Sequence, residues 1–307
     1  MGVVRPSSLG EVLDALSSAP DAHLLAGGTD FMVEVNFGHR RPDHIVALRR
    51  VPELQGWTAD NGTFDLGAMV TYRQIERELA GDLPAFAAAA RTVGSPQIRN
   101  AGTVGGNIGT ASPAGDALPL LTALDAQVVC AGTEGKRTVA LTDYITGPKR
   151  TDRRRGEVVT RVRFDRVRGP QHFLKIGPRN AMAISVACLA LVLDLDHRQV
   201  RVGLGSAGPR PARPREAEQF AAGALDWDTG HMAPDDVDEF ARMVGAATAP
   251  ITDHRGTTEY RTHAVGVLAR RALVRALRDV AGPDTARRDA AGRDTAGDDI
   301  GGTGQEE

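Results

Sequence analysis

Residues Thr92 to Pro119 read TVGSPQIRNAGTVGGNIGTASPAGDALP, a segment with six glycines, three threonines, two serines and two asparagines. Alanine-rich apolar runs precede and follow it, and we expect the polar segment itself to stay outside the hydrophobic core. Glycine has no Cβ and adopts positive φ readily, so successive peptide N–H groups can turn toward one anion. The segment therefore predicts a phosphate-binding loop, although turns of this composition also occur where nothing binds.

The glycine spacing in this segment excludes two common phosphate-binding motifs. Gly102, Gly105, Gly106 and Gly109 are not followed by the Lys and Ser or Thr of a P-loop. They also lack the dinucleotide fingerprint, which places glycines at relative positions one, three and six. Composition alone therefore leaves both a nucleotide loop and an empty turn open.

A second glycine loop favours the nucleotide interpretation. A short apolar strand expected at His23 to Ala26 leads into Gly-Gly-Thr-Asp at Gly27 to Asp30. Two such loops in one domain can hold the two phosphates of a pyrophosphate from opposite sides. Together they predict a dinucleotide cofactor.

The fingerprint spacing does occur at Gly203, Gly205 and Gly208, after another expected strand. Pro209 and Pro211 stand where a helix should begin, so no helix N-terminus could face a phosphate there. We expect this later set not to bind a nucleotide.

The paired loops resemble those of a known family. AGGTD at 26–30, GTVGGN at 102–107 and ASPAGD at 111–116 resemble the FAD-binding medium subunit of molybdenum hydroxylases, the group of xanthine dehydrogenase and aerobic carbon monoxide dehydrogenase. The resemblance covers roughly residues 1 to 278. It implies an α+β fold with a two-lobed, PCMH-type FAD-binding domain at 1–168, whose lobe boundary lies near 55–65. A C-terminal domain of antiparallel strands packed with helices follows at 169–278.

The resemblance also implies which residues hold FAD, without a covalent bond. The glycine loops would surround the pyrophosphate and the adenosine, two hydroxyl groups would donate to the cofactor, and one carboxylate would make a further contact. These residues are Leu24, Leu25, Ala26, Gly27, Gly28, Thr29, Asp30, Phe31, Thr103, Gly105, Gly106, Asn107, Thr110, Ser112 and Asp116. No catalytic residue and no metal ligand is expected on this chain.

Three further residues match positions near the flavin ring. Val158 and Val159 match apolar residues that lie against the isoalloxazine, and Lys175 matches a lysine near the flavin. A cation there would stabilise the negative charge that develops on reduction. Without the resemblance, Lys175 reads more simply as an exposed lysine on an edge strand. Val93 departs from the family, since some members carry there an aromatic residue that stacks on the cofactor, so adenine stacking is not assigned to it.

Composition excludes several functions. The net charge of −2 argues against a nucleic-acid partner, which normally leaves a basic footprint. Cys130 and Cys188 are the chain's two cysteines, whereas an iron–sulfur cluster takes four ligands, so any cluster is expected on a partner chain. No apolar run reaches the roughly 18 residues of a membrane helix, and the N-terminus has no secretory leader pattern. We expect a cytoplasmic protein without membrane insertion.

The resemblance implies an electron-transfer flavoprotein subunit. Its implied partners are a large molybdopterin-binding subunit and a small iron–sulfur subunit, assembled as a dimer of heterotrimers. FAD on this chain would accept electrons from the clusters and pass them to NAD, oxygen or a quinone. The alternative is a stand-alone flavin-dependent oxidase, which often holds FAD through a covalent His or Cys bond. Neither glycine loop contains His or Cys beyond His23, which disfavours that alternative.

The spacing of apolar residues predicts strands and helices in the C-terminal part of the chain. Strands are expected at 172–176, 184–195 and 199–204, and helices at 215–222, 234–247 and 257–278. Residues 279–307 contain almost no bulky apolar side chains and are expected to be disordered. The basic run from Lys149 to Arg155, KRTDRRR, fits either a solvated loop between strands or a docking surface for an acidic partner chain.

Overall fold

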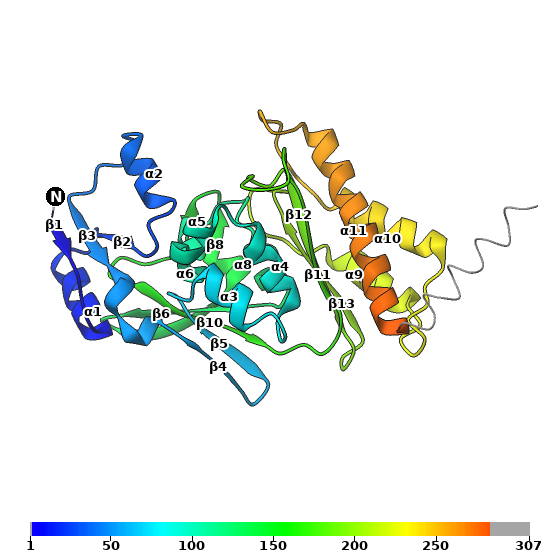
Figure 1. The fold of residues 1–307 in the computed structure, drawn as a ribbon, viewed down its shortest axis with the longest axis horizontal. Coiled ribbons are helices and arrows are strands. Elements are labelled where there is room, and N and C mark those ends of the chain that lie inside the picture. The colour runs from blue at the N-terminus through cyan, green and yellow to red at the C-terminus, as the bar shows by residue number, and fades with distance from the viewer. Residues whose placement is uncertain (1, 283–307) are drawn as a thin grey trace, which may run out of the picture.

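The computed structural model describes residues 2–282 (Figure 1). It mixes helices with mainly antiparallel sheets, so the predicted α+β class is confirmed. Residues 283–307 of the expected disordered tail lie outside the described residues. The last helix continues to Ala281, so residues 279–281 belong to that helix rather than to the tail. None of the helices in residues 2–282 has the length and apolar character that crossing a bilayer demands.

The N-terminal lobe is a small parallel sheet with strand order β1-β3-β2. Val12 and Leu16, four residues apart on one face of the first helix, are fully buried in the core of this lobe. The Ser8 hydroxyl caps that helix by accepting from the Glu11 N–H. The lobe contains β1 (Gly2–Val4), α1 (Leu9–Ser18), β2 (His23–Leu25), α2 (Phe31–Asn36), β3 (His44–Ala47) and two 3₁₀ turns, Leu48–Arg50 and Pro52–Leu54.

The second lobe is built on a five-stranded antiparallel sheet with strand order β4-β5-β10-β6-β7. Its strands are β4 (Trp57–Asp60), β5 (Thr63–Gly67), β6 (Gln127–Gly132), β7 (Gly135–Ala140) and β10 (Val158–Asp165), and a small hairpin joins β8 (Ile145–Gly147) to β9 (Arg150–Thr151). Sequence patterns missed β4 and β7, because exposed edge strands carry a weak apolar signal.

The helices of the second lobe are α3 (Tyr72–Glu78), α4 (Pro84–Thr92), α5 (Pro96–Ala101), α6 (Val104–Thr110), α7 (Leu118–Ala123) and α8 (Leu141–Tyr144). The expectation that Thr92 to Pro119 forms a loop outside the core is wrong. The segment holds α5 and α6, and Val104 and Ile108 of α6 are fully buried, one turn apart. The overlooked signals are N-cap residues, because the Thr103 hydroxyl accepts from the Gly106 N–H and opens α6.

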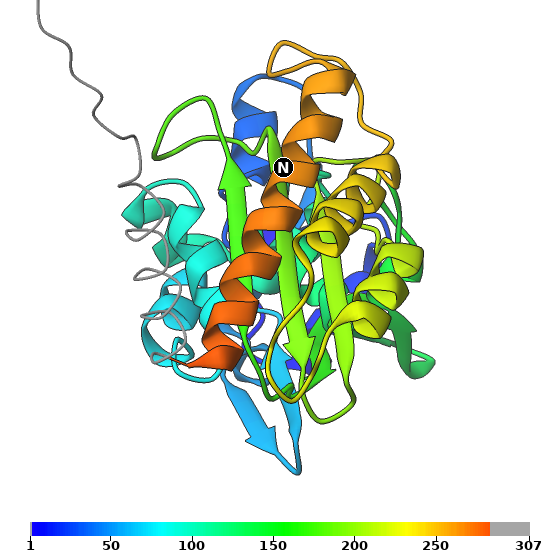
Figure 2. The same ribbon diagram turned by 90° about the vertical axis from the view of Figure 1, so that its right-hand side faces the viewer.

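The C-terminal domain is a three-stranded antiparallel sheet covered by three helices on one face (Figure 2). Helices α4 and α7 of the second lobe pack on its other face, so two cores meet across this sheet. The predicted strands and helices are all present. They are β11 (Gln171–Ile176), β12 (Ala187–Asp194), β13 (Gln199–Gly205), α9 (Arg215–Ala224), α10 (Pro234–Ala246) and α11 (Thr258–Ala281).

Two glycines of the later set, Gly203 and Gly205, lie in this packing interface. A Cβ on Gly203 would come within 1.7 Å of the Pro119 carbonyl oxygen, and one on Gly205 within 2.5 Å of the Cys188 sulfur. These glycines therefore let α7 lie directly on β13. Their fingerprint spacing reflects helix-on-sheet packing.

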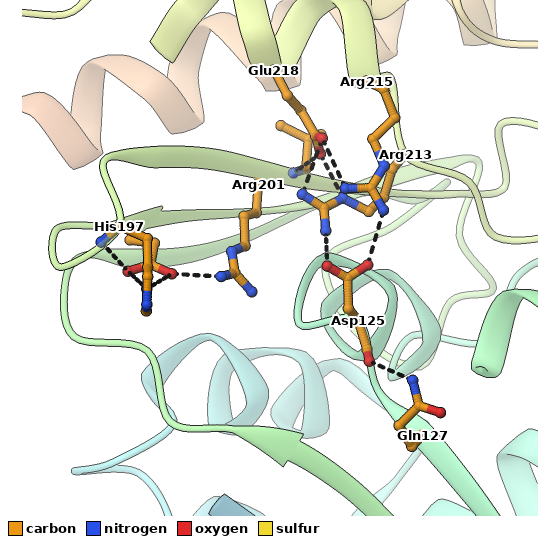
Figure 3. A network of polar contacts seen from close by, with 9 residues as sticks. Asp125, Gln127, His197, Arg201, Arg213, Arg215 and Glu218 are labelled. Carbon is orange, nitrogen blue, oxygen red and sulfur yellow. Dashed lines mark hydrogen bonds and ion pairs between the residues drawn. The ribbon is translucent and has the colours of Figure 1, made fainter. Parts of the chain in front are cut away.

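Charged side chains also join the C-terminal domain to the second lobe (Figure 3). Arg213, whose side chain is 5% exposed, donates to the buried Glu218 over 2.8 and 3.0 Å and also to Asp125 after α7. Arg215 donates to the same Asp125 over 3.0 Å. Glu218 additionally accepts from the Val202 N–H over 2.6 Å. The cluster therefore fixes α9, β13 and the end of α7 relative to one another.

Removing the buried carboxylate should destabilise the protein strongly. Glu218→Gln leaves the Arg213 guanidinium with the half-exposed Asp125 as its remaining carboxylate partner, and breaking a buried pair costs about 3–5 kcal/mol. The midpoint of urea denaturation measures this loss. The control is Asp228→Asn, which breaks an exposed pair with Arg198 and should cost at most about 1 kcal/mol. Equal midpoints for both variants would show that the buried cluster adds nothing.

Candidate cofactor site

A cavity of about 520 Å³ lies where the N-terminal lobe meets the second lobe, a size usual for small-molecule sites. Both glycine segments line it. Every site residue predicted from the sequence borders this cavity except Leu25, which lies behind the first loop, and Lys175. Residues that the sequence analysis did not assign also line it, among them His23, Glu34, Arg40, Met69, Tyr72, Tyr144, Lys149 and Arg153.

The glycines bring backbone segments into direct contact. A Cβ on Gly27 would lie 1.9 Å from the carbonyl oxygen of Ala101, which ends α5. A Cβ on Gly105 would lie 2.5 Å from the Cβ of Ala68. Any side chain at these two positions would force the backbones apart. Gly27 is therefore required for the two lobes to close around the cavity, and Gly105 lets α6 pack against the end of β5 within the second lobe.

The first glycine loop presents unused hydrogen-bond donors. Within the described residues, the peptide N–H groups from Gly27 to Asp30 donate to no protein acceptor. Gly28 has φ of 74°, the left-handed conformation that turns a peptide unit and that glycine adopts without strain. All four residues line the cavity. Consecutive free N–H groups of this kind form an anion-binding nest.

The second glycine segment works differently from the expectation. The Gly105 N–H donates to the Ala68 carbonyl over 2.8 Å, and the Gly106 N–H donates to the Thr103 hydroxyl over 3.0 Å. These donors are already used inside the protein, so α6 is a wall of the cavity rather than a second nest. Binding of the second phosphate by this segment stays a prediction, and the N–H groups of Gly105 and Gly106 are not free for it.

Three buried polar atoms of the cavity wall have no hydrogen-bond partner in the described residues, namely the Tyr72 hydroxyl, the Tyr144 hydroxyl and the Asn107 Oδ1. Burial, with a smaller effect of the Asp116 charge, raises the pKa of Tyr72 well above its usual value, so its hydroxyl keeps its proton. Buried polar groups are nearly always hydrogen-bonded. These atoms therefore point to a ligand with its own donors and acceptors.

Asp116 is the most constrained carboxylate of the cavity. Its Oδ2 accepts from Lys175 Nζ over 2.6 Å and from the Thr92 hydroxyl over 3.3 Å. Its Oδ1 accepts from the Ser185 hydroxyl over 2.6 Å, and Ser185 is fully buried. Lys175 and Ser185 belong to the C-terminal domain. That domain therefore sets the position of a carboxylate in the cavity wall.

The alternative interpretation of Lys175 as an exposed residue is wrong. Its strand β11 is indeed an edge strand, but the Lys175 side chain is only 9% exposed. It reaches the cavity through Asp116 and does not border it directly. Direct contact between Lys175 and a flavin stays a prediction.

The apolar wall comes from the start of β10. Val158 and Val159 are 1% and 7% exposed, and they belong to the cores of the N-terminal lobe and the second lobe respectively. The strand register shifts between Val159 and Arg161, a bulge that turns this end of the strand. Val93 lies on the same cavity and presents only its small apolar side chain.

The chain matches two family descriptions that together span most of its length. Residues 1–165 match "FAD binding domain in molybdopterin dehydrogenase", and residues 172–276 match "CO dehydrogenase flavoprotein C-terminal domain". The medium chain of glyceraldehyde dehydrogenase from Sulfolobus acidocaldarius is 31% identical, over 88% of this chain and 95% of that protein. The carbon monoxide dehydrogenase medium chain of Afipia carboxidovorans is also 31% identical, over 89% and 95%.

Solved structures agree with this likeness. A chain of the reconstituted carbon monoxide dehydrogenase from Oligotropha carboxidovorans superposes with a TM-score of 0.83 at 30% identity, covering 90% of this chain and 97% of that one. A chain of quinoline 2-oxidoreductase from Pseudomonas putida 86 shares the fold, with a TM-score of 0.84 at 24% identity and 92% and 98% coverage.

The two matched domains define a flavoprotein subunit of an oxidoreductase. The chain belongs to the family of FAD-binding subunits of molybdopterin dehydrogenases, which includes xanthine and carbon monoxide dehydrogenase subunits.

The residues around the cavity fit FAD. The nest at Gly27 to Asp30 suits a pyrophosphate, and the unpaired Tyr72 hydroxyl and Asn107 Oδ1 suit a cofactor rich in polar groups. The Val158 and Val159 wall suits an apolar ring system. The close contacts at Gly27 and Gly105 lie at the edge of the cavity and do not fill it.

Filling the open side of the cavity should prevent FAD binding. Gly109 of α6 lines the cavity, and a Cβ there would meet no protein atom within 4 Å. We expect Gly109→Val to fold normally and to lose at least about ten-fold in FAD occupancy, read from the ratio of flavin to protein absorbance. Gly106→Val would test this less cleanly, because its Cβ would lie 2.8 Å from the Thr103 hydroxyl that caps α6.

The matched control is Gly223→Val in α9. Gly223 is also a helical glycine with no atom within 4 Å of its added Cβ, but it lies away from the cavity. Both variants should keep the wild-type melting temperature within a few degrees, because valine has a slightly better helix propensity than glycine. Full FAD occupancy in Gly109→Val would contradict the site.

Breaking the ion pair between Lys175 and Asp116 should destabilise the folded protein. Lys175→Met leaves the buried Asp116 carboxylate without its cation, a loss of about 3–5 kcal/mol in the free energy of unfolding. Lys175→Met/Asp116→Asn removes both charges and should recover most of the loss. Urea denaturation measures the effect, with Arg270→Met at an exposed pair as the control. A wild-type midpoint for Lys175→Met would mean that the pair is not needed.

Proposed function

We propose that this chain is the FAD-carrying electron-transfer subunit of a molybdenum hydroxylase complex. It accepts electrons from the iron–sulfur clusters of a small partner subunit, which receives them from a large molybdopterin-binding subunit, and it passes them to NAD, oxygen or a quinone. The observation that carries this proposal is the match to medium chains of dehydrogenases over about 95% of their own length. A dimer of heterotrimers in the cytoplasm is the assembly that we infer.

Each group of the cavity has a part in this function. When bound, FAD supplies the redox chemistry that no side chain can perform. The N–H groups from Gly27 to Asp30 would hold the pyrophosphate. The Tyr72 hydroxyl would donate a hydrogen bond to the polar part of the cofactor, and Asn107 Oδ1 would accept one from it. The wall at Val158 and Val159 would exclude water from the apolar ring. A tuning effect of the Lys175 charge would act together with its partner Asp116.

The cavity offers a poor site for covalent attachment of a flavin. His23 is the single histidine among the residues that line it, and no cysteine does so. Burial and the neighbouring Arg40 lower the pKa of His23, and its Nδ1 lies 3.3 Å from Arg40. Burial raises the pKa of Cys130 to about 11, which disfavours a reactive thiolate. These observations favour the electron-transfer subunit over the stand-alone flavin-dependent oxidase.

The proposal predicts free FAD and dependence on partners. Acid precipitation of the full-length chain should leave all FAD in the supernatant, measured by flavin absorbance, both for wild type and for His23→Ala. The FAD of the isolated chain should not bleach anaerobically with a purine or an aldehyde. It should bleach when the co-purified large and small subunits are added with the substrate of the complex.

Two results would contradict this. FAD that stays in the acid pellet of wild type but not of His23→Ala would identify a covalent flavin and favour the stand-alone oxidase. Bleaching of the isolated chain by substrate at the rate of the whole complex would show that it oxidises that substrate itself.

A further inference from the structure

The basic run from Lys149 to Arg155 lies between the two lobes. Lys149 Nζ pairs with the Glu34 carboxylate of α2 over 2.5 Å, and Arg155 pairs with Asp21 over 2.5 Å, both partners being in the N-terminal lobe. Arg153 donates to the carbonyl of Glu157 within its own lobe. The run is therefore partly engaged inside the molecule, which neither interpretation from the sequence had assumed.

Helix α2, the partner of Lys149, is weakly attached to the rest of the protein. None of its residues is buried, and Met32 and Val33 are 41% and 49% exposed. The segment is bounded by Gly28 and Gly38, both in the left-handed conformation with φ of 74° and 72°. Figure 1 shows α2 connected to its sheet by an extended stretch on either side. Phe31 and Glu34 of this helix line the cavity, so α2 forms one side of it with no buried residue of its own.

Lys149 has a backbone conformation that supports a special role. Its φ is 54°, a left-handed value that a lysine rarely adopts and that persists only where the surroundings hold it. Its N–H donates over 2.9 Å to the carbonyl of Ala111, the C-cap of α6. One residue thus bonds to the end of the glycine-rich helix through its backbone and to α2 through its side chain.

Two cations share the Glu34 carboxylate. Arg40 pairs with the second oxygen of Glu34 over 2.8 Å, and its guanidinium lies 5.4 Å above the centre of the Phe31 ring. The hydrogen bond from Lys149, together with Arg40, lowers the pKa of Glu34. Glu34 is 17% exposed, whereas the Lys149 side chain is 58% exposed. Arg40 therefore orders α2 within its own lobe, and Lys149 supplies the link across the cavity.

We propose that Lys149 is a positioning residue that holds α2 closed over bound FAD and so slows its release. This inference rests on the proposed FAD site. It assigns Lys149, the first residue of the basic run, to retention of the cofactor. Because Lys149 is largely exposed, its ion pair is weak, and we expect an effect of about three- to five-fold on the release rate rather than loss of binding.

The experiment measures FAD release from the full-length chain. FAD-loaded protein is diluted into an excess of an FAD-specific apoprotein such as apo-glucose oxidase, and release is followed by the oxidase activity that this trap regains. Lys149→Met should release FAD about three- to five-fold faster than wild type, and Lys149→Arg should restore slow release. Salt should accelerate release from wild type more than from Lys149→Met, because it screens the pair that the variant lacks.

Two further variants isolate the interaction. Glu34→Gln should accelerate release, and adding Lys149→Met to Glu34→Gln should cause little further change, the coupling expected of a pair in contact. Arg155→Met is the matched control, because it removes a charge of the same run from an inter-lobe pair that does not line the cavity. Its release rate should equal that of wild type.

Several results would overturn the inference. One is an FAD release rate in Lys149→Met that equals the wild-type rate. Another is an increase in release rate in Arg155→Met as large as that in Lys149→Met. A third is a double variant in which the effects of Lys149→Met and Glu34→Gln on the release rate add. Weaker binding of a partner subunit by Lys149→Met with unchanged FAD release would assign the run to docking instead. A wild-type chain that carries no FAD would refute the proposed function itself, a different outcome from each of these.

Discussion

The structure depends on one close approach between two backbones. The first glycine loop meets the end of α5 at Gly27, where a Cβ would lie 1.9 Å from the Ala101 carbonyl oxygen. No side chain can be accommodated there by rotation, because the obstacle is backbone. The contact joins the N-terminal lobe to the second lobe and leaves the N–H groups up to Asp30 facing the cavity. Closing the lobes and exposing the donors are therefore two results of the same missing side chain.

A second constraint comes from the C-terminal domain, which contributes little surface to the cavity but orders part of its wall. Ser185 and Lys175 fix both oxygens of Asp116. The Ser185 carbonyl in turn accepts from the Ser206 hydroxyl, and Arg261 of α11 donates to the Val186 carbonyl next to it. A continuous set of hydrogen bonds thus runs from α11 to the cofactor site. The distant domain has a direct structural reason to be present in a flavin-binding subunit.

Much of this arrangement could be predicted from the sequence, and what could not has a common cause. Glycine clusters report positions where backbone must approach backbone or a ligand, so Gly27 and Gly105 were identified. Helix caps are also local signals, and the Thr71 and Gln74 pattern that precedes α3 does form a capping box. Tyr72, one residue further, was missed because its role depends on Asp116 and Asn107, which only the fold brings near. Local patterns carry no information about such distant partners.

Charged side chains and peptide groups have different places in the cavity wall. The cations that line it are engaged by the protein, since Arg40 and Lys149 share Glu34 and Arg153 bonds to a backbone carbonyl. The donors that we propose for the phosphates are instead the peptide groups of Gly27 to Asp30, which donate to no protein acceptor within the described residues. Peptide dipoles cannot be titrated, and they cost no side-chain entropy when a ligand binds. The lining cations thus hold the walls of the site in place, and under the proposed function the backbone itself would contact the anion.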